Sequence, residues 1–329
     1  MRVAILYNEP RDGSEASDED VLVQRDCVVK ALSACGHESR EIACTLDLAS
    51  LYDVLRADPP DCVFNLVESL GGTDRLQPVL PVLLDALGIP YTGSPAAAML
   101  EASDKLGVKR RLHRMGLPTP EWIDSDCPAD ASLRGTFIVK ARFEHASVGM
   151  DDSAVVDIRN AGEIEEAIRA RSAMTGLEMF AERFIEGREF NIAMIAAVGG
   201  KPEVLSPAEI DFSAFPAGKP KIVGYDAKWT DESFEFNATP RRFSFPPSDR
   251  ALLDEFATLS RAVWNAFELG GYARIDFRVD EHDRPQILEI NTNPCLSPDA
   301  GFAAALAASG YTFERGIELI VNDALKASR

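Results

Sequence analysis

The segment QILEINTNP (residues 286–294) carries a carboxylate and a carboxamide, Glu289 and Asn291, two positions apart in a largely apolar run that ends at a proline. Side chains alternate across a β-strand, so these two residues point to the same face. The apolar residues predicted to anchor the strand in a core are Ile287, Leu288 and Ile290. The polar pair therefore faces either bulk water or a binding site, and the rest of the chain decides which.

A second strand is predicted just before this segment, in YARIDFRVD (272–280), with a turn at EHDRP between the two. Neighbours across such a hairpin lie about 5 Å apart, so Asp276, Glu289 and Asn291 can bring oxygen atoms together. Hard cations such as Mg²⁺ prefer oxygen ligands, although a solvated hairpin face explains the spacing equally well. Arg274 shares the face of Asp276, where it forms either a plain ion pair or a cation for a transferred phosphoryl group.

The chain is acidic overall, so the positions of its basic residues are informative. The chain has 329 residues, 46% of them hydrophobic, and a formal net charge of −19. That charge argues against nucleic-acid binding, which needs a basic surface, but a bound nucleotide would still need local lysines or arginines. Lys140 ends the strand TFIVK before a small-residue loop. This position suits phosphate binding, with an ordinary surface lysine as the alternative.

A second polar cluster occurs in AERFIEGRE, where a strand ends before a turn. Glu182 could accept a hydrogen bond from an adenine amino group, while Phe184 and Ile185 offer backbone groups to the edge of the ring. Glu189 could accept hydrogen bonds from ribose hydroxyls. A strand, a turn and a second strand with solvated acids would account for the same pattern.

The cysteines and the hydropathy of the chain indicate the cellular compartment in which the protein is expected. No two cysteines form a CxxC pair and the four histidines are scattered, so neither zinc nor a disulfide framework is predicted. The cysteines expected to be reduced thiols in a cytoplasmic protein are Cys27, Cys35, Cys44, Cys62, Cys127 and Cys295. Neither a signal peptide nor an apolar run of 18 residues is present, so no membrane association is expected.

Apolar runs and helical stretches alternate in the first part of the chain. RVAILY (2–7), DCVFNLVE (61–68) and the shorter GIPYTGS (88–94) are predicted as buried strands. This alternation is typical of a parallel α/β domain whose strand ends face the ligand. A second unit runs from about Ser94 to Ile185, and a third begins at EFNIAMIAA.

Several stretches, taken in order, resemble the ATP-grasp superfamily and, within it, the D-alanine–D-alanine ligase family. They are GIPYTGSPAAAMLEASDK, FIVKARFEHASVGM, AERFIEGREF, GYDAKWTDE, YARIDF and LEINTNP. The resemblance implies an α/β fold of the ATP-grasp type with three domains. These are an N-terminal parallel α/β domain (1–94), a small lid domain (95–186) and a C-terminal α+β domain with the metal and phosphate site (187–329).

The same resemblance implies a reaction. ATP phosphorylates a carboxylate, an amine attacks the acyl phosphate, and an amide forms with release of ADP and phosphate. The implied cofactors are ATP and two Mg²⁺ ions, with Mn²⁺ as the other candidate cation. The implied partners are small-molecule carboxylate and amine substrates, amino acids or peptide-like, and a homodimer is one candidate assembly.

The family's functional positions can be matched residue by residue. The candidate ATP ligands are Lys105 and Lys140 for the phosphates, Glu182, Phe184 and Ile185 for adenine, and Glu189 for ribose. Asp276, Glu289 and Asn291 match the residues that bind the two Mg²⁺ ions. Arg274 would stabilise the acyl phosphate and the tetrahedral state. Lys228 would contact phosphate from a mobile loop that covers the substrates and excludes water.

The chain departs from the family on the substrate side. The lid-loop glycine–serine–serine reads His145–Ala146–Ser147, and the substrate-loop tyrosine is matched by Trp229, which has no phenolic hydroxyl. Cys295 replaces a glycine whose backbone N–H helps to stabilise the oxyanion. The serine that binds the second substrate's carboxylate falls at Ala300, next to Asp299.

Two further acids belong to this side of the site. Glu68 lies where the ligases carry a histidine–glycine pair, and Asp18 is the nearest counterpart of the glutamate that grips the first substrate's ammonium. Loss of hydroxyls and gain of acids favour an acceptor other than free D-alanine, one that is more cationic, amide-bearing or larger. The alternatives are an authentic D-alanine–D-alanine ligase with compensating contacts and a non-catalytic ATP-binding sensor or scaffold. Arg274 counts against the last of these, because a pure binder has no need of it.

Overall fold

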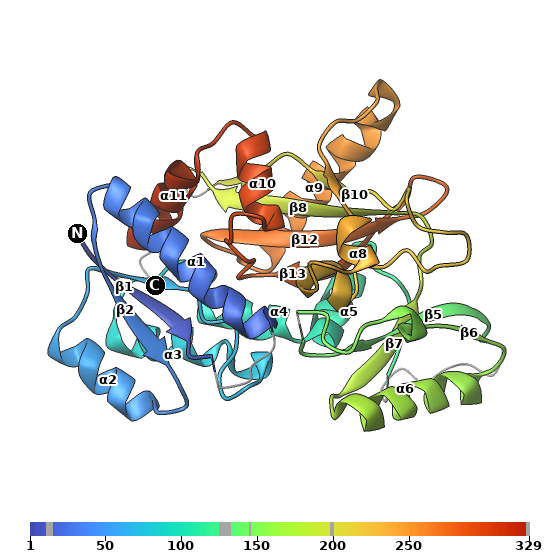
Figure 1. The fold of residues 1–329 in the computed structure, drawn as a ribbon, viewed down its shortest axis with the longest axis horizontal. Coiled ribbons are helices and arrows are strands. Elements are labelled where there is room, and N and C mark those ends of the chain that lie inside the picture. The colour runs from blue at the N-terminus through green and yellow to red at the C-terminus, as the bar shows by residue number, and fades with distance from the viewer. Residues whose placement is uncertain (11–15, 125–132, 145, 198–200, 327–329) are drawn as a thin grey trace.

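Three β-sheets, each with its own helices, form three lobes (Figure 1). In the view of Figure 1 the N-terminal sheet lies at the left, the C-terminal sheet above the centre and a four-stranded sheet at the lower right. The residues that the computed structural model describes are 1–10, 16–124, 133–144, 146–197 and 201–326, with the backbone alone for 16–18.

The N-terminal sheet is parallel, with strand order β2-β1-β3. Its strands are β1 (Arg2–Asn8), β2 (Glu38–Cys44) and β3 (Cys62–Asn65), and its helices are α1 (Ala16–Ala34), α2 (Leu48–Ala57) and α3 (Val79–Leu87). β1 and β3 are apolar and largely buried, as expected for strands that are covered on both faces. The predicted parallel α/β arrangement of this region is confirmed.

Two details of this sheet differ from what its sequence suggests. β2 does not stand out in the sequence, because it is an edge strand of mostly polar residues and only its last residue is buried. The segment 88–94, expected to be a third strand, forms a single bridge between Tyr91 and Val63. Pro90 has no N–H to donate and Gly93 has a φ of 91°, so strand pairing does not extend on either side.

The four-stranded sheet is antiparallel, with strand order β4-β7-β5-β6. Its strands are β4 (Trp122–Ile123), β5 (Gly135–Ala141), β6 (Val155–Ile158) and β7 (Met179–Arg183). Helix α6 (Ala161–Thr175) covers one face, where Phe137, Ile164 and Ala181 form a small core. The opposite face is left to line a site.

The C-terminal sheet is antiparallel, with strand order β11-β10-β8-β12-β13 and with β9 paired to β8. Its strands are β8 (Arg188–Ala196), β9 (Pro202–Val204), β10 (Ala208–Ile210), β11 (Arg241–Arg242), β12 (Tyr272–Val279) and β13 (Pro285–Asn291). The helices of this part are α7 (Tyr225–Trp229), α8 (Phe234–Asn237), α9 (Arg250–Ala266), α10 (Gly301–Ala308) and α11 (Phe313–Lys326). Short 3₁₀ turns occur in all three parts of the chain: η1 (Asp74–Leu76) before α3, η2 (Asp152–Ala154) before β6 and η3 (Pro247–Asp249) before α9. The predicted hairpin of β12 and β13 is confirmed.

A β-bulge in this hairpin corrects one sequence prediction. The register passes from Asp276 opposite Glu289 to Phe277 opposite Ile287, so Leu288 is an extra residue on β13. Ile287 is buried as predicted, and so is Ile290. Leu288 instead lines the cavity described below, because the bulge turns it out of the core.

Helices α4 (Ala96–Ser103) and α5 (Lys105–Arg114) connect the N-terminal sheet to the four-stranded sheet. Their buried residues Ala98 and Leu112 belong to the core of the C-terminal sheet, together with Phe277 and residues of α9. The strands of the three sheets fall within residues 1–94, 95–186 and 187–329, whereas α4 and α5 pack on the C-terminal sheet. The domain boundaries at 94 and 186 stay a prediction.

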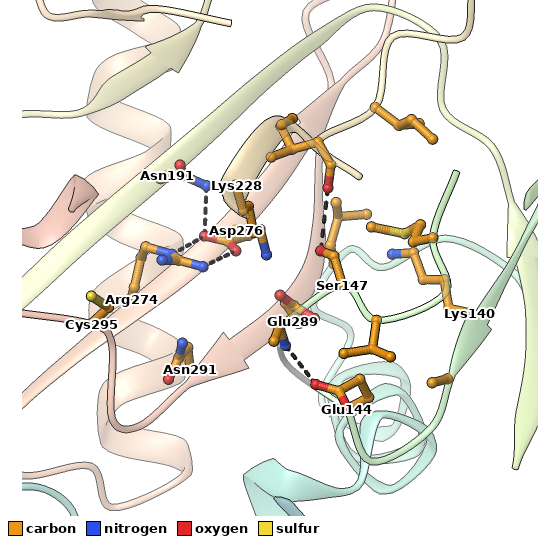
Figure 2. Close-up of a pocket in the computed structure, with 18 of the residues that line it drawn as sticks. Lys140, Glu144, Ser147, Asn191, Lys228, Arg274, Asp276, Glu289, Asn291 and Cys295 are labelled. Carbon is orange, nitrogen blue, oxygen red and sulfur yellow. Dashed lines mark hydrogen bonds and ion pairs between the residues drawn. The ribbon is translucent and has the colours of Figure 1, made fainter. Parts of the chain in front are cut away.

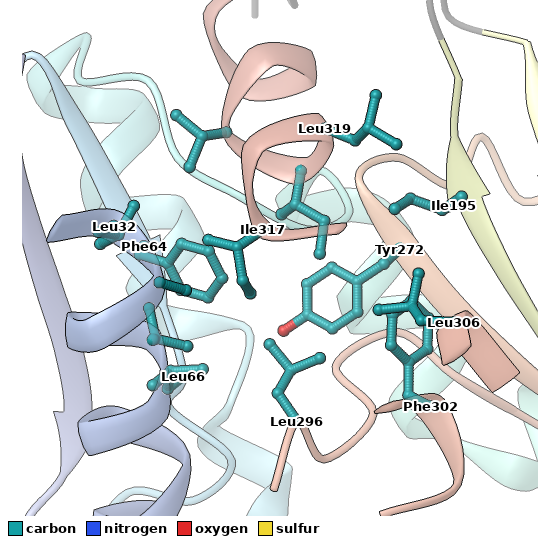
Figure 3. Packing of buried hydrophobic residues seen from close by; sticks show 14 of the residues in the cluster. Leu32, Phe64, Leu66, Ile195, Tyr272, Leu296, Phe302, Leu306, Ile317 and Leu319 are labelled. Carbon is teal, nitrogen blue, oxygen red and sulfur yellow. The ribbon is translucent and has the colours of Figure 1, made fainter. Parts of the chain in front are cut away.

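One hydrophobic core joins the N-terminal and C-terminal sheets (Figure 3). Phe64 of β3 and Ile317 of α11 lie in the same cluster as Tyr272 of β12. The rings of Tyr272 and Phe302 meet edge to face with 5.3 Å between centroids. The Tyr272 hydroxyl donates a hydrogen bond to Asn293 Oδ1 at 2.6 Å, so this core also fixes the loop that follows β13.

Within the part of the chain that the structure describes, no helix is both long and apolar enough to cross a membrane. The five cysteines that lie in that part are free thiols, two of them buried. The sixth, Cys127, lies outside the described residues.

We expect Gly271→Ala to destabilise the protein by about 2–5 kcal/mol. Gly271 has a φ of 63°, which costs an L-residue roughly 1–2 kcal/mol. A Cβ here would also lie 2.6 Å from the backbone nitrogen of Gly93, and such overlap typically adds about 1–3 kcal/mol. Gly310→Ala is the matched control, since Gly310 has a φ of 84° and open space around its Cβ position. Chemical unfolding should show only about 1–2 kcal/mol for the control; equal losses would mean that the contact with Gly93 contributes nothing.

Candidate active site

A cavity of about 810 Å³ lies among the three sheets, within the range of about 300–1,000 Å³ typical of ligand pockets. The side chain of Asp18 and the whole of His145 lie outside the described residues. The other side chains predicted for the site line this cavity: Lys105, Lys140, Glu182, Phe184, Ile185, Glu189, Arg274, Asp276, Glu289, Asn291, Lys228, Glu68, Ser147, Trp229, Cys295 and Asp299.

The centre of the cavity is built on the pairing of β12 with its two neighbours. Asp276 lies opposite Asn191 of β8 and opposite Glu289 of β13. Arg274 donates to both carboxylate oxygens of Asp276, at 2.7 and 2.9 Å, and Asn191 Nδ2 donates to Oδ1 at 2.8 Å (Figure 2). Burial opposes the charge of Arg274, but Asp276 more than offsets it and raises the pKa of the guanidinium. A fixed positive charge therefore lies at the centre.

Helix α5 places a lysine beside Glu289. Asp104 caps this helix by accepting a hydrogen bond from a backbone N–H of the first turn at 3.1 Å. Lys105, the first helical residue, is buried, and its Nζ lies 3.4 Å from Glu289 Oε2. The same ammonium donates to the backbone carbonyl of Glu144 in the lid loop. The capped helix start thus directs one cation toward both the carboxylate and the lid.

The oxygen-bearing residues on this wall suit a hard cation. In register, Asp276 faces Glu289 and Arg274 faces Asn291, and Figure 2 shows Asp276, Lys228 and Glu289 pointing toward one another. Mg²⁺ binds through one or two carboxylates and takes further ligands from phosphates and water. Among the described residues, no group of three His, Cys, Asp or Glu side chains forms a complete metal cage. The donors present therefore fit a cation that is bound together with a phosphate.

Glu182 of β7 holds two lysines. Its Oε2 lies 2.5 Å from Lys109 Nζ and its Oε1 lies 2.5 Å from Lys140 Nζ, with Lys109 and Glu182 only 0% and 1% exposed. Lys109 also donates to Thr119, whose hydroxyl donates to the Ile287 carbonyl at 2.8 Å. Burial would raise the pKa of Glu182, but the two lysines more than offset it and hold that pKa below its usual value. A hydrogen-bonded network of charged groups therefore links the four-stranded sheet to β13. Lys109 is a member of this network that the motifs do not indicate.

Arg278 is a second residue that the motifs miss. Its Nε donates to the Ile185 carbonyl at 2.9 Å and its Nη1 to Glu189 Oε2 at 3.0 Å, and its guanidinium lies 5.1 Å from the centre of the Phe184 ring. Burial raises the pKa of Glu189, and Arg278 opposes that shift. The carbonyl of Ile185 thus already accepts one hydrogen bond. Position 278 shares the face of Arg274 by strand alternation, a signal that the sequence does contain.

Lys228 lies on the short helix α7, where a loop was expected, and α7 and the segment before it are held against residues 146–147. Trp229 Nε1 donates to the Ala146 carbonyl at 2.9 Å, and the Ser147 hydroxyl donates to the Val223 carbonyl at 3.3 Å. Burial lowers the pKa of Lys228. The indole makes a contact to the lid backbone that needs no phenolic hydroxyl. Trp229 therefore connects α7 to residue 146 without a tyrosine at this position.

An acidic cluster lies around Cys295, on the side of Arg274 that faces away from Lys140 in Figure 2. The Cys295 thiol donates to Asp20 Oδ2 at 3.0 Å and the Ser297 hydroxyl donates to Oδ1 at 2.6 Å. Gln24 bridges Asp20 and Glu68 with donor–acceptor distances of 3.1 and 2.9 Å. Burial raises the pKa of the Cys295 thiol well above its usual value, and Glu68 and Asp20 add to the shift. The thiol is therefore protonated and acts as a hydrogen-bond donor.

Asp20 is the helix α1 acid that lines this wall, two positions after the predicted Asp18. Asp20 and Gln24 are four residues apart and share a helix face, which is the spacing that could have identified them. At the rim, Asp299 is exposed, and its backbone carbonyl accepts a hydrogen bond from Arg241 Nη1 at 2.8 Å. Ala300 begins α10 without a side-chain cap.

The whole architecture matches solved structures. The D-alanine–D-alanine ligase of Bacillus anthracis complexed with ATP superposes with a TM-score of 0.73 at 18% identity, covering 100% of this chain and 98% of that one. The ligase of Coxiella burnetii gives a TM-score of 0.70 at 17% identity, with 100% and 94% covered. The fold is therefore the ATP-grasp fold of ATP-dependent ligases, as predicted.

Sequence comparison identifies the family of ligases to which the chain belongs. A family described as "D-ala D-ala ligase C-terminus" matches residues 128–322, which is more than half of the chain. The D-alanine–D-alanine ligase of Stutzerimonas stutzeri is 30% identical over 333 residues, covering 99% of this chain and 95% of that protein. An uncharacterised protein of Sinorhizobium fredii is 28% identical over 306 residues, with 90% and 86% covered. The chain belongs to the D-alanine–D-alanine ligase family of ATP-dependent ligases.

We expect Glu182→Gln to destabilise the protein by about 3–5 kcal/mol, because it leaves Lys109 and Lys140 without their buried partner. The double variant Lys109→Met/Glu182→Gln should cost less than the sum of the two single changes, since it removes charges of both signs. Glu121→Gln serves as the control, because Glu121 is a 78% exposed acid paired with Arg183. Urea unfolding of Glu182→Gln, Lys109→Met, the double variant and Glu121→Gln gives the coupling free energy between positions 109 and 182. Strictly additive losses of unfolding free energy would contradict a network.

Proposed function

We propose that this ligase uses ATP to join a small amino acid, through its carboxylate, to an amine acceptor other than free D-alanine. An acyl phosphate forms first, and the amine then displaces phosphate to leave an amide. The observation that carries the proposal is the contrast between the two ends of one cavity. At the ATP end the matched residues are present, whereas at the acceptor end Cys295 and Ala300 stand where the family has glycine and serine.

Lys105 and Lys140 are the proposed phosphate ligands, with the backbone of Phe184 and Ile185 at the adenine edge and Glu189 at the ribose. Glu182 is proposed to accept a hydrogen bond from the adenine amino group while it holds Lys140 in place. The oxygens of Asp276, Glu289 and Asn291 would hold two Mg²⁺ ions, or Mn²⁺. These cations would supply charge neutralisation for phosphoryl transfer.

Arg274 and Lys228 are proposed to act on the reacting groups. The guanidinium of Arg274 is oriented by Asp276, so it can stabilise negative charge on the acyl phosphate and the tetrahedral state with little reorganisation. Lys228 faces the same centre from helix α7. The hydrogen bond from Trp229 to the lid supports exclusion of water, which would otherwise hydrolyse the acyl phosphate.

Asp20, two positions after the predicted Asp18, is also proposed to bind the ammonium of the first substrate. Gln24 connects Asp20 to Glu68, so two carboxylates are available on this wall for one cationic group. The protonated thiol of Cys295 and the hydroxyl of Ser297 hold Asp20 in place. We propose the cytoplasm as the place of action, because ATP is supplied there.

Glu289→Gln and Asn291→Ala should each lower ATP-dependent phosphate release by about 10²-fold or more. Asn291→Ala should leave the melting temperature nearly unchanged, and Glu289→Gln should lower it only slightly, because Lys105 loses the carboxylate 3.4 Å away but keeps its hydrogen bond to the Glu144 carbonyl. A direct metal ligand should matter more than an outer-shell group, whose loss typically costs about 10–100-fold. Packing of β13 depends on its apolar residues and not on these two. Gln286→Ala, on the same strand but outside the cavity, is the control. Matched losses of stability and activity would show that the pair is structural.

Free D-alanine should be a poor acceptor, with turnover well below the range of about 1–10³ s⁻¹ typical of enzymes. Ala300→Ser should raise D-alanyl-D-alanine formation roughly ten- to a hundredfold, since a hydrogen bond to a charged carboxylate contributes about 1.5–3 kcal/mol. Ala303→Ser, further along the same helix and outside the cavity, is the control.

The measurement is phosphate release with ATP and a panel of amino acids and dipeptides of both configurations. Wild-type formation of D-alanyl-D-alanine within the typical range would favour the authentic ligase over the proposed function. ATP binding without phosphate release for any pair of panel members would favour a sensor or scaffold.

A further inference from the structure

Arg241 reaches the acceptor end of the cavity, although it matches no motif position of the family. It lies on the two-residue strand β11 and lines the cavity together with Cys295, Asp299 and Ala300. A Cβ placed on Gly301 would lie 3.2 Å from Arg241 Nε, so the guanidinium group crosses the first residue of α10. It therefore sits beside Ala300, where the family has a serine that binds a carboxylate.

Among the cations that line the cavity, Arg241 is unusual in its partners. Arg274, Arg278, Lys105 and Lys140 each lie within 4.0 Å of a carboxylate. Arg241 instead donates to a neutral group, the backbone carbonyl of Asp299, which takes one of its five N–H donors. No ion pair to a carboxylate is found for Arg241 within the described residues.

The charges around Arg241 favour an added anion. Although the side chain as a whole is exposed, the pKa of the guanidinium is lowered, first by burial and then by the positive charge of Arg274, while Asp299 opposes the shift. Two guanidinium groups that repel each other are both stabilised by a carboxylate bound near them. The cavity thus has a cation at its rim with donors to spare.

We propose that Arg241 binds the carboxylate of the amine acceptor and so sets the acceptor class, an inference that rests on the proposed function. Arg241 lies at the exposed rim, so the carboxylate that it binds belongs to the outer end of the acceptor. This position suits a dipeptide, or an amino acid with a side-chain carboxylate, better than a single alanine. Arg241 would then supply, as a bidentate pair, the hydrogen bonds to a carboxylate that Ala300 has no hydroxyl to make.

The test compares each acceptor with its carboxamide, in which the charge is removed and the shape is retained. Phosphate release is measured with saturating ATP for alanine, glutamate, alanyl-alanine and alanyl-glutamate, in both configurations, against the matching amides. We expect wild type to prefer the free acid by about 10- to 100-fold in acceptor KM. Arg241→Gln should abolish that preference with little effect on the KM for ATP, and Arg241→Lys should retain part of it.

Arg242→Gln is the matched control. Arg242 is the next residue of the same strand, but it pairs with Glu209 at 2.5 Å and lies outside the cavity. This variant should keep the preference of wild type for the acid. Persistence of the preference in Arg241→Gln, or its equal loss in both variants, would overturn the proposal.

Failure of the proposed function can be told apart from failure of this inference. If D-alanine proves to be the natural acceptor, the comparison of D-alanine with D-alaninamide still tests Arg241, because both variants can be assayed with that pair. If no pair turns over, calorimetric binding of the same acids and amides to protein loaded with ADP replaces the assay. Equal binding of acid and amide by wild type, including no binding of either, would also overturn the assignment.

Discussion

The hydrogen-bonded pairing of β12 with β8 on one side and β13 on the other fixes the register on which the site depends. Alternation along β12 sends Ile275 and Phe277 into the core, and it turns Arg274 and Asp276 to the cavity. A slip of one residue would exchange the two faces and place charged groups in the core. Burial of the apolar face therefore selects the register that assembles the charged face.

The same arrangement explains why the charges of the cavity are mutually compensated. Arg274 is held by Asp276, Lys105 lies near Glu289, and Lys140 is held by Glu182. An isolated charge in such an enclosed place would be costly, so each of these cations has a carboxylate beside it. A nucleotide brings further negative charge to these lysines, next to carboxylates already present. Divalent cations at Asp276 and Glu289 would offset that repulsion, which is a physical reason for a metal-dependent reaction at this wall.

The sequence predicts the parts of the molecule whose pattern is local. The β12–β13 hairpin is long and alternating, so Asp276, Glu289 and Asn291 could be placed on one face without a structure. The one error on that strand, Leu288, comes from a bulge, and a bulge changes the alternation without leaving a mark in the composition. The segment 88–94 fails as a strand for a related reason, because apolar content alone does not report the missing donor of a proline. Other parts of the site depend on tertiary contacts. Lys109 is one lysine among several basic residues in its helix, and only the approach of β7 makes it a buried partner of Glu182.

The two ends of the cavity differ in how far their residues can change. Lys109 and Glu182 are buried and pair with each other, and Arg274 pairs with Asp276, so altering any of them leaves a charge unpaired in an enclosed place. Arg241 and Asp299 are exposed at the rim, on a two-residue edge strand and in a loop, where substitutions usually cost little stability. Under the proposed function, specificity for the acceptor can therefore be altered at the rim without disturbing the groups assigned to ATP. The proposed combination of a retained ATP end and an altered acceptor end is what this division of costs allows.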